Sequence, residues 1–119
     1  MSRRIERVNE LRQAIAENSG ALRGLTFSPG QVVVAPGAKA ILFYAINALA
    51  GPGDEVIVQS AVHPFCCLPI VGCGAVPVFA DIDLPTRLIS PASVRERIGP
   101  RTKVVISVHM SGLPCAMDA

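Results

Sequence analysis

The residues best suited to chemistry in this chain form a short turn, Gly37, Ala38 and Lys39, between an apolar run and a helix-forming segment. A glycine at this place lets a ligand approach the backbone closely. The first N–H groups of the following helix have no acceptor within the helix, and the helix dipole adds partial positive charge there. The turn therefore predicts a cradle for a phosphate group. An ordinary turn that binds nothing would use the same residues, and the turn alone does not decide between the two.

Two histidines and two aspartates follow predicted strands. His63 comes just after a strand expected over Glu55–Val58, at the edge where open parallel sheets hold ligands. It is either a site residue or a half-exposed loop histidine. His109 follows a later strand, where it either lines a substrate pocket or packs against neighbours. Asp81 and Asp83 read as turn caps and solvated charges more than as an acid–base pair, because no other group is expected to converge on them.

Four cysteines, Cys66, Cys67, Cys73 and Cys115, lie among apolar or small residues. Two are adjacent, which does not resemble a disulfide framework. A zinc site could combine His63 with the first three, but their spacing matches no common zinc finger, and buried cysteine often serves as a small apolar residue. We therefore expect no metal site.

The turn at Gly37 must be positioned by the elements on either side of it. Val32–Val34 is a β-branched run typical of a buried parallel strand. Ala38–Leu49 contains neither Gly nor Pro, and its apolar residues recur at helical spacing. Gly51–Gly53 ends that helix, and Glu55–Val58 begins the next strand. The whole stretch predicts a strand–helix–strand unit.

The rest of the chain continues the alternation of helices and strands. We expect an amphipathic helix over Ser2–Ser19, a helix over Pro64–Gly72 that Pro69 kinks or breaks, a strand over Val76–Ala80, a helix over Pro91–Ile98 capped by Ser90, and a strand over Lys103–Val108. This alternation predicts an α/β fold, a mostly parallel sheet with helices on both faces.

Composition narrows the function further. The chain has 119 residues, of which half are hydrophobic and 17% charged, so it can bury a core. Its 11 basic residues are spread out against 9 acidic ones, and only 4% are aromatic, which argues against nucleic-acid binding. No apolar run reaches the roughly 20 residues that a membrane helix needs. We expect a soluble, cytoplasmic protein without a membrane anchor.

Several motifs carry a resemblance to a known family. They are GPGDEVIV, PVFADID, SPASVRERIGPRTKVVISVH and GLPCAMDA, in that order. Together they resemble the start of the large domain of fold-type I pyridoxal-phosphate (PLP) enzymes, and specifically the DegT/StrS-type sugar aminotransferases. The earlier stretch QVVVAPGAKAILF is closer to class I aspartate-type aminotransferases, which stand as the alternative family.

The resemblance implies a cofactor and gives roles to four residues. Gly37, Ala38 and Lys39 match the turn whose backbone N–H groups hold the PLP phosphate in the family. His63 falls where the superfamily places an aromatic ring that stacks on the pyridine of PLP. The implied reaction is transamination between a small-molecule amino donor and a keto-sugar or keto-acid acceptor, in a full-length homodimer.

One requirement of that chemistry is missing. PLP aminotransferases need a lysine that forms a Schiff base and an acid beside the pyridine nitrogen. Lys39 and Lys103 are the only lysines, one in the phosphate turn and the other at the opposite end of a strand. We therefore expect the chain to be an N-terminal fragment that is inactive alone.

As one partial large domain, the chain would comprise an N-terminal helix and loop over residues 1–30 and a sheet region over residues 31–119. Three other interpretations stay open. They are a non-enzymatic phosphate- or nucleotide-binding module, an oligomerisation remnant that binds no anion, and a thiol or zinc protein.

Overall fold

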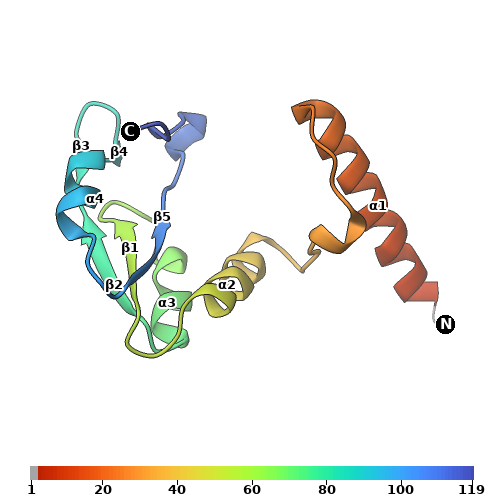
Figure 1. Cartoon of the computed structure of the whole chain (residues 1–119), viewed down its shortest axis with the longest axis horizontal. Helices are drawn as coiled ribbons and strands as arrows, with labels where there is room; N and C mark the ends of the chain where they lie inside the picture. Colours follow the sequence, from red (N-terminus) through yellow and green to blue (C-terminus); the bar gives the residue numbers. More distant parts are fainter. Residues whose placement is uncertain (1–2) are drawn as a thin grey trace. The chain divides into compact units, whose positions relative to one another are not determined.

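The computed structural model describes residues 3–119 and, of the side chains, those from Glu6 onward. The chain divides into two compact units, residues 1–41 and residues 42–119. Figure 1 shows the elements of both.

The first unit contains a long helix and a loop that folds back along it. Helix α1 spans Arg3–Arg23, four residues past the predicted end at Ser19. Gly20 lies buried within the helix, and its carbonyl accepts a hydrogen bond from the N–H of Leu25 at 3.0 Å. The glycine thus makes room for the returning loop instead of ending the helix. Gly24, with φ +65°, follows the last helical residue.

The predicted strand at Val32–Val34 is absent, and that prediction was wrong. After the 3₁₀ turn η1 (Pro29–Gln31) the backbone is irregular up to the turn at Gly37. Val33 remains 67% exposed. The carbonyl of Val32 accepts a hydrogen bond from the Arg12 Nε of α1 at 2.9 Å, in place of a bond to a neighbouring strand. A strand needs a partner, and no described strand pairs with this segment.

The second unit is built on a three-stranded sheet in the order β2-β1-β5. Strand β1 (Glu55–Gln59) lies in the middle and pairs in parallel with β2 (Val76–Ala80) and β5 (Thr102–Ile106). The last of these strands ends two residues before the predicted Val108. The prediction of a parallel sheet is confirmed.

Helices cover both faces of this sheet, as predicted. On one face, Val56 and Val58 pack with Ile46 of α2 (Ala38–Leu49) and Ile70 of α3 (Leu68–Gly72). On the other face, Ile57 packs in a second cluster, against which Val94 of α4 (Pro91–Arg97) lies. Alternate residues of β1 thus enter opposite cores, as the pleat of a strand requires.

Local signals explain the connecting segments. The expected helix over Pro64–Gly72 is broken into a 3₁₀ turn, η2 (Pro64–Cys66), and α3, with Pro69 in the first turn of α3 where its missing N–H costs nothing. Strands β3 (Ile82–Asp83) and β4 (Leu88–Ile89) form a small antiparallel pair that the sequence did not indicate.

Two further connections complete the second unit. Ser90 caps α4 by accepting a hydrogen bond from the N–H of Ser93. The 3₁₀ turn η3 (Met110–Gly112) follows β5. No helix within residues 3–119 has the length and apolar character that crossing a membrane requires.

Candidate functional site

The turn before α2 has the geometry of an open glycine turn. Gly37 has φ +105°, a backbone conformation that residues other than glycine rarely adopt. Its carbonyl accepts a hydrogen bond from the N–H of Ile41 at 3.4 Å, which starts the helix. Its own N–H donates to the carbonyl of Ala35 at 2.7 Å, so any anion at this turn must bind N–H groups that follow Gly37. A Cβ placed on Gly37 would meet no described atom within 4 Å. The space above the turn is therefore open.

His63 is held in one orientation just beyond β1. Its Nδ1 accepts a hydrogen bond from the N–H of Phe65 at 3.3 Å. Its ring stacks on that of Phe65, with the centroids 4.8 Å apart and the planes 8° from parallel. Because Nδ1 is the acceptor, the neutral ring carries its proton on Nε2. The result is an exposed, oriented imidazole at the carboxyl edge of the sheet.

The predicted site residues fall in different units. Gly37, Ala38 and Lys39 belong to the first unit, and His63 belongs to the second. Their union in one site stays a prediction. Within the second unit, His63 and His109 follow the neighbouring strands β1 and β5, so both emerge at the same edge of the sheet.

His109 is also held through its ring. Its Nδ1 accepts a hydrogen bond from the N–H of Cys115 at 3.0 Å. This bond closes a loop in which Ser111 and Gly112 both have positive φ, 53° and 82°. His109 is thus an exposed loop histidine whose ring is tied to the backbone.

Gln59 at the end of β1 is a residue that the sequence analysis missed. It is fully buried, and both ends of its amide are bonded. Its Nε2 donates to the carbonyl of Ala61 at 3.0 Å, and its Oε1 accepts from the N–H of Val108 at 3.2 Å. A glutamine directly after the apolar run Val56–Val58 is the one sequence signal that points to this contact.

Asp81 and Asp83 hold neighbouring segments in place. The Asp81 carboxylate lies 3.5 Å from Arg97 of α4, and its backbone N–H donates to the Ser93 hydroxyl at 2.9 Å. The carbonyl of Asp83 accepts hydrogen bonds from the N–H groups of Thr86 and Arg87. The two aspartates therefore fix a hairpin and a helix, in agreement with the interpretation of them as turn residues.

The cysteines are all free thiols. Burial raises the pKa of Cys66 and Cys67, and the negative charge of the Cys67 thiolate raises the pKa of Cys66 further. Cys73 donates its S–H to the carbonyl of Ile70. Within the described residues, no three His, Cys, Asp or Glu side chains converge as metal ligands.

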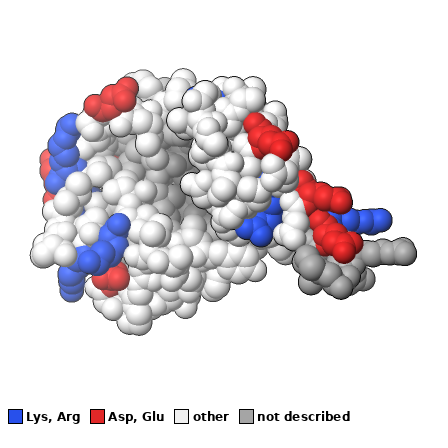
Figure 2. Space-filling model, turned by 45° about the vertical axis from the view of Figure 1, so that its right-hand side comes forward, with Lys and Arg blue, Asp and Glu red and all other residues white. Residues whose placement is uncertain are grey.

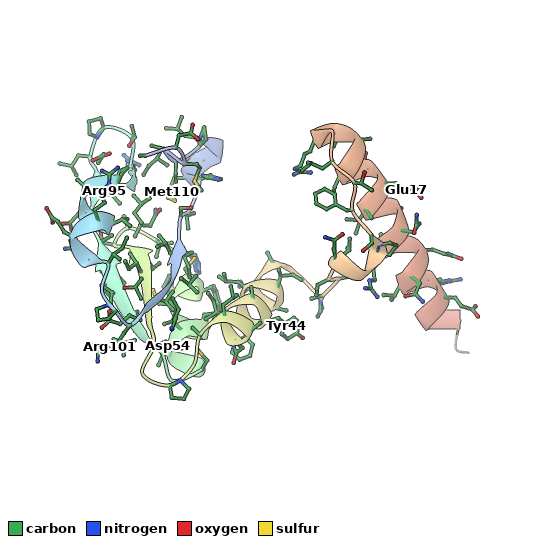
Figure 3. All side chains as sticks on the ribbon, in the orientation of Figure 1. Glu17, Tyr44, Asp54, Arg95, Arg101 and Met110 are labelled. Atoms are coloured by element: carbon green, nitrogen blue, oxygen red, sulfur yellow. The ribbon has the colours of Figure 1, made fainter. Side chains whose placement is uncertain are left out.

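The opposite, amino edge of the sheet has a different character. Arg101 donates to the Glu55 carboxylate at 2.6 Å, and Lys103 is the second residue of β5. Figure 3 shows Arg101 and Asp54 together at this edge, with Met110 at the other end of β5. Figure 2 shows described Lys and Arg side chains and described Asp and Glu side chains on the same face. Lys103 therefore lies away from the edge that carries the histidines.

Comparison with known proteins identifies the family. The family model described as the DegT/DnrJ/EryC1/StrS aminotransferase family matches residues 3–119. The chain belongs to this family. The resemblance seen in the motifs is thereby confirmed.

Relatives of the DegT-family chain include enzymes and a biosynthetic protein. The spore coat polysaccharide biosynthesis protein SpsC of Bacillus subtilis is 46% identical over 81 residues, which are 67% of this chain and 21% of that protein. A putative sugar aminotransferase from Streptococcus pneumoniae, solved in its PLP form, is 36% identical, with a TM-score of 0.66 over 68% of this chain and 21% of the other.

A third relative lies outside the sugar enzymes. The aspartate aminotransferase of Thermotoga maritima is 37% identical, with a TM-score of 0.77 over 82% of this chain and 26% of the other. The α/β fold of PLP aminotransferases is therefore shared with both classes that the sequence suggested. The DegT-family chain spans about a fifth of the length of SpsC, 21%.

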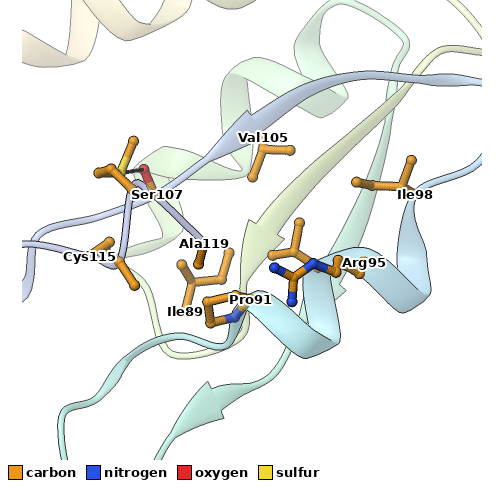
Figure 4. A pocket seen from close by; sticks show the side chains of 11 residues that line it. Ile89, Pro91, Arg95, Ile98, Val105, Ser107, Cys115 and Ala119 are labelled. Carbon is orange, nitrogen blue, oxygen red and sulfur yellow. Dashed lines mark hydrogen bonds between the residues drawn. The ribbon is translucent and has the colours of Figure 1, made fainter.

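The second unit of this DegT-family chain also contains a hollow of about 360 Å³. It lies between α4 and β5, and Figure 4 shows Ile89, Ile98 and Val105 around it, with Arg95 reaching along α4. Ser107 at its rim donates a hydrogen bond to the Met117 sulfur at 3.7 Å. Its lining is mostly apolar, unlike the polar edge that carries His63 and His109.

Proposed function

We propose that this chain supplies part of the cofactor site of a PLP-dependent aminotransferase of the DegT/StrS type. Backbone N–H groups at the start of α2, after Gly37, bind the phosphate, and His63 stacks on the pyridine ring. The open turn at Gly37, with its positive φ and no described atom within 4 Å of an added Cβ, is the observation that carries this proposal.

The described residues fit the phosphate of PLP better than its reactive end. When bound, PLP supplies an electron sink to the amino donor. The turn binds and orients the phosphate, since the helix N-terminus favours an anion. His63 presents a flat ring with its proton on Nε2. Neither lysine of the chain suits the covalent bond to PLP, because Lys39 belongs to the phosphate turn and Lys103 lies near the amino edge.

The proposal extends to the whole enzyme of which such a site is part. The reaction would transfer an amino group from a small-molecule donor to a keto-sugar or keto-acid acceptor. A homodimer would perform it. Four free thiols favour a reducing compartment, and we therefore place the protein in the cytoplasm.

A pair of variants at the turn tests the phosphate assignment. PLP is titrated against the wild-type chain, Gly37→Val and Lys39→Ala, with binding followed by cofactor absorbance. We expect weak, reversible binding by the wild type. Gly37→Val should weaken it more than Lys39→Ala, because the valine side chain fills the space that the phosphate needs. The opposite order would indicate a simple charge effect and contradict the cradle.

Borohydride reduction tests the absence of a PLP-bonded lysine. After incubation with PLP and reduction, peptide mass mapping should find no stoichiometric adduct, and no amino donor should turn over. An adduct on Lys39 or Lys103 together with turnover would show that the chain carries its own catalytic lysine.

A phosphate- or nucleotide-binding module without PLP is the second candidate function. The open turn at Gly37 fits this module equally well, because backbone N–H groups at a helix start would serve any phosphate. Competition decides between the two. Inorganic phosphate should displace PLP only at much higher concentration if His63 stacking contributes to PLP binding. Equal affinities would favour the module.

A further inference from the structure

Gln59 continues the contact between β1 and β5 where their backbone pairing ends. The last paired residues of the two strands are Val58 and Ile106. Beyond them, the Gln59 side chain accepts a hydrogen bond from the N–H of Val108, 49 positions along the chain, at 3.2 Å. The other end of its amide donates to the carbonyl of Ala61 at 3.0 Å. One buried side chain therefore ties the ends of two strands.

The contact continues into the loop that carries His109. Val108, which Gln59 holds through its N–H, accepts a hydrogen bond at its carbonyl from the Cys115 Sγ at 3.4 Å. The Cys115 N–H donates to the His109 Nδ1 at 3.0 Å. A continuous series of hydrogen bonds thus links Ala61, Gln59, Val108, Cys115 and His109. Its first member lies two residues before His63.

We propose that Gln59 is a positioning residue that holds the His109 loop against the end of β1, beside the segment that leads to His63. An apolar side chain would fill the same space. The amide donates to Ala61 and accepts from Val108 at once, which an apolar side chain cannot do. The relevance of this positioning to cofactor binding rests on the proposed function. The positioning itself rests on the hydrogen bonds alone.

Three variants separate positioning from general stability. Gln59→Met keeps the length of the side chain and removes both hydrogen bonds. Gln59→Glu keeps an acceptor for the Val108 N–H in either protonation state of its carboxyl. Val58→Ala is the matched control, since Val58 precedes Gln59 in the same strand, is equally buried at 0% exposure, and loses packing without losing a hydrogen bond.

Nuclear magnetic resonance of the full chain gives the readout. The chain has two histidines, so both rings can be assigned. In the wild type we expect His109 to show a single Nε2–H tautomer, with the amides of Val108 and Cys115 protected from hydrogen exchange. Gln59→Met should lose the single tautomer and both protections. Gln59→Glu should retain protection at Val108, which is rescue by the conservative variant. Val58→Ala should retain the His109 pattern.

Two results would overturn the inference. One is a Gln59→Met chain that keeps the His109 tautomer and the two protected amides. The other is a Val58→Ala chain that loses them to the same extent, which would make the effect one of stability. If Gln59→Met does not fold, the wild type decides, because a Val108 amide that exchanges freely or a His109 ring without a single Nε2–H tautomer contradicts the inference.

A PLP titration of the same variants separates this inference from the proposed function. Loss of the His109 pattern in Gln59→Met, together with a wild type that does not bind PLP, supports the positioning role and overturns the cofactor assignment. Loss of the pattern with a raised PLP dissociation constant in Gln59→Met, and not in Val58→Ala, supports both.

Discussion

Two short apolar segments of nearly the same composition adopt different structures in this protein. Val32–Val34 is irregular, and Val33 is 67% exposed. Val56–Val58 is the centre of β1, and all three of its residues are fully buried. The second segment has a parallel strand on each side and a helical layer on each face, while the first lies beside α1. β-branched residues favour a strand only where neighbours are present to pair with it and cover it.

The largest difference should appear on truncation of one side chain in each segment. Ile57→Ala should lower the free energy of unfolding by about 3 kcal/mol, because it leaves a cavity in the core. Val33→Ala should change it by less than about 0.5 kcal/mol, because that side chain is mostly solvated. Urea unfolding followed by circular dichroism measures both. Similar losses at the two positions would show that burial does not distinguish the two segments.

A smaller loss of stability is expected at Gly37, where the backbone conformation favours glycine and no partner strand is involved. Gly37→Ala should cost about 1–2 kcal/mol, since an L-residue is strained at positive φ. Gly51→Ala is the matched control at the other end of α2, where φ is not positive and the space is open, and it should be neutral. Thermal unfolding compares the two, and an equal loss would show that φ is not the cause.

Helix capping offers the next contrast between the two units. Ser90→Ala should cost about 1 kcal/mol, because the Ser90 hydroxyl accepts a hydrogen bond from the first turn of α4. Ser28→Ala, before the exposed turn η1, should cost less than about 0.5 kcal/mol. Urea midpoints of the two variants test the order. A larger loss at Ser28 would mean that η1 stabilises its unit more than its exposure indicates.

The smallest effect concerns the thiols that follow β1. Because the pKa of Cys66 and Cys67 is raised in the folded chain, both should stay protonated to higher pH than in the unfolded chain. Their contribution to stability is complete below the unfolded pKa and is lost as the pH rises through the folded pKa. Iodoacetamide alkylation, mapped by peptide mass across pH 7–10, should be slower for these residues in the native chain than in urea. Equal rates in both states would refute this.

Sequence alone predicted the elements whose signals are local. The helix at Ala38–Leu49, the strand at Val76–Ala80 and the Ser90 cap follow from periodicity, flanking glycines and capping chemistry within a few residues. Even the break before Pro69 was visible. Helix α1 is longer than predicted because Gly20 has two interpretations. It could end the helix, or it could be a place where another segment crosses the helix. Only the hydrogen bond from the Leu25 N–H to the Gly20 carbonyl decides between them.

The wrong prediction at Val32–Val34 and the missed contact of Gln59 both depend on residues that are distant in the sequence. Whether Val32–Val34 pairs depends on a neighbouring strand, which periodicity does not reveal. Gln59 gives almost no local signal, because the N–H group that donates to its Oε1 belongs to Val108, which is distant in the sequence. Of the candidate site, the glycine turn and the positions of His63 and His109 could be inferred from strand ends. The hydrogen bonds that orient the two rings could not.

The place of β1 between two partners also bears on the order in which the sheet can assemble. Glu55 pairs with Val76 on one side and with Thr102 on the other, so the second contact closes a loop about twice as long. Doubling a loop adds about 0.6 kcal/mol to the entropic cost of closing it. The β1–β2 pair, with α3 between its strands, is therefore the cheaper first step of folding. During that step one side of β1 is unpaired, and the Gln59 Oε1 has no donor. Pairing of β5 forms the three-stranded sheet and brings the Val108 N–H to Gln59. Among the described residues, Gln59 is the only polar one that is fully buried.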